Sequence, residues 1–173
     1  MTRSPYRSAL EWLRRRADNI VAMMLAAMFA AFMLQIIFRY LLNLPIGWTH
    51  EVSVVLWIWL VLFGSAFVIR EHEEIRFDLI YGAVGARARR AMVFVAAAAL
   101  ILMFTISLPA VIDYVGFMKV ERTAYLKIRF DYLYSIYVIF AAAMIVRYLW
   151  LAWRAIRGEA PKPVDPTQTV SGI

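Results

Sequence analysis

The chain has 173 residues, of which 64% are apolar, and a formal net charge of +7. A soluble domain of this length needs far more polar surface, so the composition indicates an integral membrane protein. The absence of cysteine excludes disulfides, thiol catalysis and cysteine-ligated metals. The positive charge does not point to nucleic acid, because Lys and Arg lie at the ends of apolar runs, where they fix topology.

Four apolar runs are long enough to cross a bilayer as helices. The sequence predicts spans at about residues 18–40, 50–70, 88–112 and 131–153. A hydrocarbon core about 30 Å thick needs about 20 helical residues, which these runs supply. The helical pattern continues past the third span to about residue 120, so this helix is expected to be long. The first run is too long for a signal-peptide core and is therefore expected to be a retained span.

Three further segments lie outside the spans. Residues 5–17 and 74–84 carry apolar side chains at helical spacing, which predicts short amphipathic helices lying on the membrane surface. Residues 159–173 contain three prolines and are expected to form a disordered cytoplasmic tail. The expected fold is an all-α integral membrane protein, with one four-helix transmembrane domain over residues 1–158 and short interfacial helices.

Lys and Arg are distributed unevenly between the two sides of the predicted spans. Fourteen of the 19 lie in the N-terminal segment, in the loop between the second and third spans, and in the C-terminal segment. Since cytoplasmic segments carry the excess of Lys and Arg, both termini are expected in the cytoplasm.

The apolar cores of the spans contain no acidic or basic side chain. No Asp, Glu, Lys, Arg or His occurs in residues 20–38, 52–69, 91–112 or 132–146. A charge at mid-membrane costs roughly 2.5 to 3.5 kcal/mol and is retained for proton relays or ion paths, so its absence argues against a proton-coupled carrier that works alone. A haem cytochrome would need in-span histidine pairs, whereas His50 and His72 are expected at opposite membrane faces.

Candidate functional residues therefore lie at the two faces. Arg39 ends the first span and Glu51 begins the second, and the short connection between them would let the two approach. Favourable charge at helix ends explains both residues equally well without a functional contact. Arg70, Arg76 and Asp78 form a charged cluster at the inner face, for which solvated charges are the alternative interpretation.

One stretch of the chain resembles a known family. Its residues are Trp48-Thr49-His50-Glu51, then Trp59, Gly64 and Arg70, then Glu74-Ile75-Arg76-Phe77-Asp78. Their order and spacing are similar to those of the small membrane subunit (DctQ-like) of tripartite ATP-independent periplasmic (TRAP) transporters. The chain departs from the family pattern at His50 and Glu74, so no role is carried over to these two residues.

The resemblance implies a subunit that performs no chemistry and binds no cofactor. It would pair, in the bacterial inner membrane, with a large permease subunit that carries substrate and sodium. A periplasmic binding protein would deliver an organic acid or similar anionic solute. The interface residues that follow from the resemblance and from the helix ends are Arg39, Trp48, Glu51, Trp59, Gly64, Arg70, Arg76 and Asp78.

The periplasmic docking surface is expected at residues 48–51 and 119–131, with Glu121, Arg122 and Lys127 as its candidate residues. Two alternatives to a scaffold subunit remain open: a small self-contained oligomeric carrier of another family, and a membrane enzyme or cytochrome. The transported substrate cannot be read from this sequence, because the binding protein and large subunit would determine it.

Overall fold

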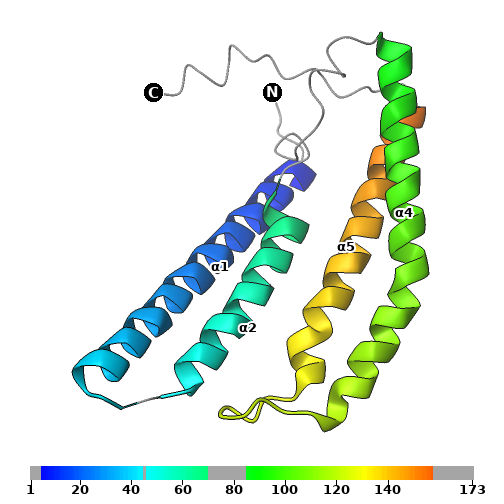
Figure 1. Cartoon of the computed structure of the whole chain (residues 1–173). Coiled ribbons are helices and arrows are strands. Elements are labelled where there is room, and N and C mark those ends of the chain that lie inside the picture. Colours follow the sequence, from blue (N-terminus) through cyan, green and yellow to red (C-terminus); the bar gives the residue numbers. More distant parts are fainter. Residues whose placement is uncertain (1–4, 45, 70–84, 158–173) are drawn as a thin grey trace. The chain divides into compact units, whose positions relative to one another are not determined.

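A computed structural model describes residues 5–44, 46–69 and 85–157. The predicted surface helix at 74–84, the cluster of Arg70, Arg76 and Asp78, and the predicted tail at 159–173 lie outside these residues. The described elements are helical: α1 (Pro5–Ile36), a π-helical turn (Ile37–Leu41), α2 (Trp48–Phe63), a second π-helical turn (Gly64–Val68), α4 (Ala86–Phe117), a 3-10 turn (Met118–Val120) and α5 (Phe130–Ile156) (Figure 1).

Four of these helical stretches are long and apolar enough to cross a membrane. They comprise Trp12–Leu41, Trp48–Val68, Arg87–Val120 and Phe130–Ile156. The prediction of an all-α protein with four transmembrane helices is therefore confirmed. α5 continues past Arg147 without a break, although that cation falls within its C-terminal half.

Residues 5–17 differ from the prediction of a separate surface helix, because they form the first part of α1. Pro5 occupies the start of the helix, where its missing N–H costs nothing. No Gly or Pro occurs between Tyr6 and Leu44, so no residue interrupts the helix between the amphipathic segment and the span. α1 ends beyond its π-helical turn at Asn43, whose φ of 52° reverses the chain and lets the Leu44 N–H donate to the Phe38 carbonyl at 2.9 Å.

The helices fall into two compact units. The first contains the described parts of Met1–Val68 together with Leu108–Ala141. In it, α1 packs against α2, and their short connection makes the two helices antiparallel (Figure 1). The second contains the described parts of Ile69–Ser107 and Ala142–Ile173. Its buried apolar residues are small: Val93, Ala97, Ala152 and Ala155. Small side chains let helix backbones approach closely where there is no water to drive association.

Large apolar side chains cover the outside of the spans. Met23, Leu102, Ile106 and Val146 are each more than half exposed. Monomeric soluble proteins rarely expose contiguous apolar patches of this kind, so this surface requires lipid or another membrane protein as its neighbour.

Cationic and aromatic side chains pair at both ends of two of the helices, α1 and α5. Arg16 lies over the Trp12 ring at 5.2 Å near the start of α1, and Arg157 lies over the Trp153 ring at 4.7 Å just past the end of α5. At the opposite ends of the same two helices, Arg39 lies 6.0 Å from the Tyr40 ring and Arg129 lies 5.1 Å from the Tyr132 ring. Such pairs suit the headgroup region, where amphipathic rings and snorkelling cations are enriched.

Candidate functional site

The best-defined polar arrangement in the first unit joins the start of α2 to the loop between α4 and α5. Glu51 lies in the first turn of α2, where the helix N-terminus favours an anion. Its Oε1 accepts the Tyr125 N–H at 2.7 Å and its Oε2 accepts the Leu126 N–H at 2.9 Å. Figure 1 shows both segments at the same end of the helices. A single carboxylate thus holds two consecutive residues of a loop more than 70 positions away in the sequence.

The loop at 121–129 also has bonds of its own. Arg122 and Arg129 form an isolated antiparallel bridge. The Thr123 N–H donates to the Ile128 carbonyl at 2.9 Å, and the Ile128 N–H donates to the Thr123 hydroxyl at 3.1 Å. Lys127 has a φ of 55°, which allows the chain to reverse between these residues. The base of the loop is therefore closed by internal bonds, whereas Tyr125 and Leu126 at its tip are held by Glu51.

The start of α2 fits closely under this loop. Gly47 precedes the helix, and a Cβ atom at this position would collide with the ring of Tyr125. Thr49 is fully buried, and its hydroxyl donates to the Ile46 carbonyl at 3.4 Å. The residue before α2 thus has to be small because the Tyr125 ring occupies the space beside it.

A second link joins α2 to the beginning of α5. The indole N–H of Trp59 donates to the Leu133 carbonyl at 3.0 Å. Two residues earlier in α5, Asp131 accepts two bonds from Arg129, at 3.1 Å from Nε and 2.6 Å from Nη2. Leu133 and Ile136 are buried on α5. The start of α5 is therefore fixed both to α2 and to the last residue of the loop.

The structure brings together the two segments predicted to share one surface, 48–51 and 119–131. Within this surface, Glu121, Arg122 and Lys127 are exposed, and Trp48 is 40% exposed. Arg39 is exposed too, and among the described residues its guanidinium forms no ion pair with Glu51. An ion pair between Arg39 and Glu51 is therefore not seen, and both oxygens of the carboxylate accept backbone N–H groups of the loop instead.

Gly64 opens the second π-helical turn and faces α1. A Cβ atom there would meet only Val21, whose Cγ2 would lie at 3.9 Å, an ordinary contact. The packing of α1 on α2 therefore does not itself require glycine at position 64.

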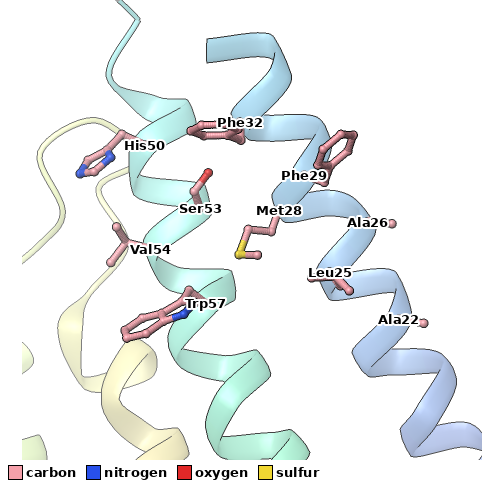
Figure 2. A pocket seen from close by; sticks show the side chains of 10 residues that line it. All are labelled: Ala22, Leu25, Ala26, Met28, Phe29, Phe32, His50, Ser53, Val54 and Trp57. Atoms are coloured by element: carbon pink, nitrogen blue, oxygen red, sulfur yellow. The ribbon is translucent and has the colours of Figure 1, made fainter. Parts of the chain in front are cut away.

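A groove of about 750 Å³ runs between α1 and α2 (Figure 2). Its walls are apolar, with Phe29 and Phe32 on α1 and Val54 and Trp57 on α2, and its polar members are His50 and Ser53. The Ser53 hydroxyl donates within its own helix, to the Thr49 carbonyl at 2.9 Å. Within residues 5–44, 46–69 and 85–157, no group of His, Asp and Glu side chains is arranged to hold a metal ion.

Sequence reasoning missed the partners of Glu51 and the roles of Thr123 and Gly47. The available signals were an acidic residue in the first turn of a helix and a glycine directly before it. Neither signal identifies a partner, because every residue except proline carries the backbone N–H that Glu51 accepts.

Four long apolar helices with lipid-type surfaces define a multi-pass membrane protein. Over residues 28–158 the chain matches the family described as "Tripartite ATP-independent periplasmic transporters, DctQ component". It is also 24% identical over 171 residues, covering 85% of this chain and 74% of the relative, to the C4-dicarboxylate TRAP transporter small permease protein DctQ of Vibrio cholerae serotype O1. The chain therefore belongs to the DctQ family, and the resemblance drawn from residues 48–78 is confirmed.

Proposed function

We propose that this chain is the non-catalytic small permease subunit of a TRAP-type secondary transporter in the bacterial inner membrane. In this role it braces a large permease subunit and helps a periplasmic substrate-binding protein to dock. The family match over residues 28–158 carries the proposal, since it includes the C-terminal end of α1 and all of α2, α4 and α5.

The chemistry of the spans supports an auxiliary role. Residues 20–38, 52–69, 91–112 and 132–146 contain no Asp, Glu, Lys, Arg or His. A subunit that moved protons or ions would be expected to retain such groups in spite of their cost at mid-membrane. The polar contacts with a long reach in sequence, from Glu51 and Trp59, join helix ends and a loop instead.

Substrate and coupling ion follow from the family assignment and not from any site in this chain. We expect sodium-coupled uptake of an organic acid or similar anionic solute, in which the large subunit binds both substrate and sodium. The relative from Vibrio cholerae is named for C4-dicarboxylates, which are anionic organic acids.

The test is affinity purification of the tagged chain in mild detergent, followed by reconstitution. We expect a larger membrane protein to co-purify, and uptake in proteoliposomes to require that protein together with a binding protein. Proteoliposomes that contain this chain alone should show no uptake. Transport by the chain alone would contradict the proposal and favour a self-contained oligomeric carrier, and a haem absorbance spectrum from the purified chain would favour a cytochrome.

A further inference from the structure

The family assignment does not explain why Glu51 binds the loop at 121–129. Its two oxygens receive the N–H groups of Tyr125 and Leu126 at 2.7 and 2.9 Å. Consecutive N–H groups aimed at one anion form an anion-binding concavity, and hydrogen bonds to a charged acceptor are roughly twice as strong as neutral ones. The anion that shapes this loop is thus a side chain of the protein itself.

Loss of Glu51 would affect the tip of the loop and spare its base. The bonds between Thr123 and Ile128 and the bridge between Arg122 and Arg129 join residues of the loop to one another and do not need Glu51. The Thr123 hydroxyl and the Ala124 N–H also interact with the carboxylate. Tyr125 and Leu126 lie between these pairs and depend on the carboxylate. The tip can therefore become mobile while the rest of the loop keeps its form.

The side chains presented by the loop suit an acidic protein surface. Arg122 and Lys127 are exposed cations and Glu121 is an exposed anion, whereas Arg129 is paired with Asp131, so the exposed charge of the loop is net positive. Tyr125 is 63% exposed between them and offers an amphipathic ring of the kind enriched at protein interfaces. A layer of lipid headgroups does not require side chains in a fixed arrangement. The two bonds from Glu51 that fix the loop tip therefore favour a folded protein over lipid as its partner.

From this geometry we infer that Glu51 is a positioning residue: its carboxylate fixes the loop tip so that Arg122, Tyr125 and Lys127 can bind an acidic face of the periplasmic binding protein. The inference rests on the proposed function, because it assigns a docking element to that transporter. A preformed tip lowers the ordering cost of association. Glu51 should therefore act on the affinity of docking and not on the transport step.

The experiment compares Glu51→Ala and Glu51→Gln with the wild type and with Asp113→Ala, which removes an exposed carboxylate on α4 outside the predicted docking surface. The complex of this chain with its co-purified large subunit is reconstituted in proteoliposomes for uptake and in nanodiscs for hydrogen exchange. Two quantities are taken from uptake: the binding-protein concentration that gives half-maximal rate, and the maximal rate. Amide exchange of residues 121–129 is measured without binding protein.

We expect Glu51→Ala to speed exchange at Tyr125 and Leu126 and to raise the half-saturating concentration about tenfold, while the maximal rate stays within about twofold. Glu51→Gln should lie between, because its amide oxygen can accept one N–H while its NH₂ group cannot accept the other. Asp113→Ala should behave as the wild type.

The chemistry of the partner is tested separately with Arg122→Glu. This change should raise the half-saturating concentration and leave exchange at the tip unchanged, and added salt should weaken wild-type docking. If anionic lipid in the nanodisc slows loop exchange in the absence of binding protein, the loop binds lipid, and the assignment to a protein partner is overturned.

Three other results overturn the inference. If amide exchange at Tyr125 and Leu126 is unchanged in Glu51→Ala, Glu51 does not hold the loop tip. If exchange is faster but the half-saturating concentration of binding protein is unchanged, the loop tip has no role in docking. If only the maximal uptake rate falls, Glu51 acts in the transport step. If Glu51→Ala fails to insert into the membrane, Glu51→Gln is judged by the same criteria. Failure of the proposed function is seen separately, as absence of binding-protein-dependent uptake by the wild type.

Discussion

At the scale of residues, Trp59 provides one hydrogen bond that joins α2 to α5. Its indole N–H donates to the Leu133 carbonyl at 3.0 Å. Trp59→Phe keeps an aromatic ring but removes the donor, so we expect a loss of about 1 kcal/mol of stability and a melting temperature about 2 to 4 °C lower. Thermal unfolding of the purified protein in detergent measures this. Trp57→Phe is the control, since Trp57 is 58% exposed on the same helix, and equal losses in both variants would show that the bond to Leu133 does not matter.

The sequence identifies individual polar side chains such as Glu51 as candidates for a structural or functional role, but it does not identify the groups that they bind. Glu51 stands out as an acidic residue in the first turn of a predicted helix. Its partners are two backbone N–H groups in a loop 74 and 75 residues away, and no residue type marks those groups in advance. Arg39 carries the opposite charge and lies near Glu51 in the sequence, but both oxygens of Glu51 accept N–H groups of the loop.

At the scale of elements, the helices follow from hydrophobic run length and from the placement of helix breakers. The structure differs from the prediction at the start of α1, because the amphipathic segment and the span form one continuous helix. Arg14, Arg15 and Arg16 separate them in composition, yet none of these residues breaks a helix. The π-helical turns at Ile37–Leu41 and Gly64–Val68 have no comparable sequence signal.

Position 64 distinguishes packing within the chain from packing against a partner. Gly64→Ala places a methyl group 3.9 Å from Val21 and gains helix propensity of about 0.8 to 1 kcal/mol, so membrane expression and thermal stability should be unchanged or higher. Ala97→Leu is the contrasting variant: Ala97 is fully buried, and overpacking there should cost about 1 to 3 kcal/mol. If Gly64→Ala lowers stability as much as Ala97→Leu, there is no room for a methyl group between position 64 and Val21, and the observed packing of α1 on α2 is contradicted. If it abolishes only co-purification of the large subunit, Gly64 lies in that interface.

At the scale of the whole molecule, the uneven distribution of Lys and Arg predicts the orientation in the membrane. The chain has no cysteine, so a single introduced cysteine reports its side of the membrane without background. In spheroplasts, a membrane-impermeant maleimide should label Lys127→Cys directly and Arg157→Cys only after lysis. Both positions are exposed, so labelling reflects the side of the membrane and not burial. The reverse labelling pattern would contradict cytoplasmic termini.

The cation–aromatic pairs along α1 have a consequence for the membrane in which the protein can work. Arg16 with Trp12 and Arg39 with Tyr40 mark two levels about 35 Å apart at 1.5 Å per residue, slightly more than the thickness of about 30 Å of a hydrocarbon core. A helix tied to the headgroups at both levels cannot slide along the membrane normal without burying a charge. In a thinner bilayer α1 must therefore tilt. Because α2 packs against α1 and carries Glu51, which binds the loop at 121–129, a change in bilayer thickness should alter the position of this loop.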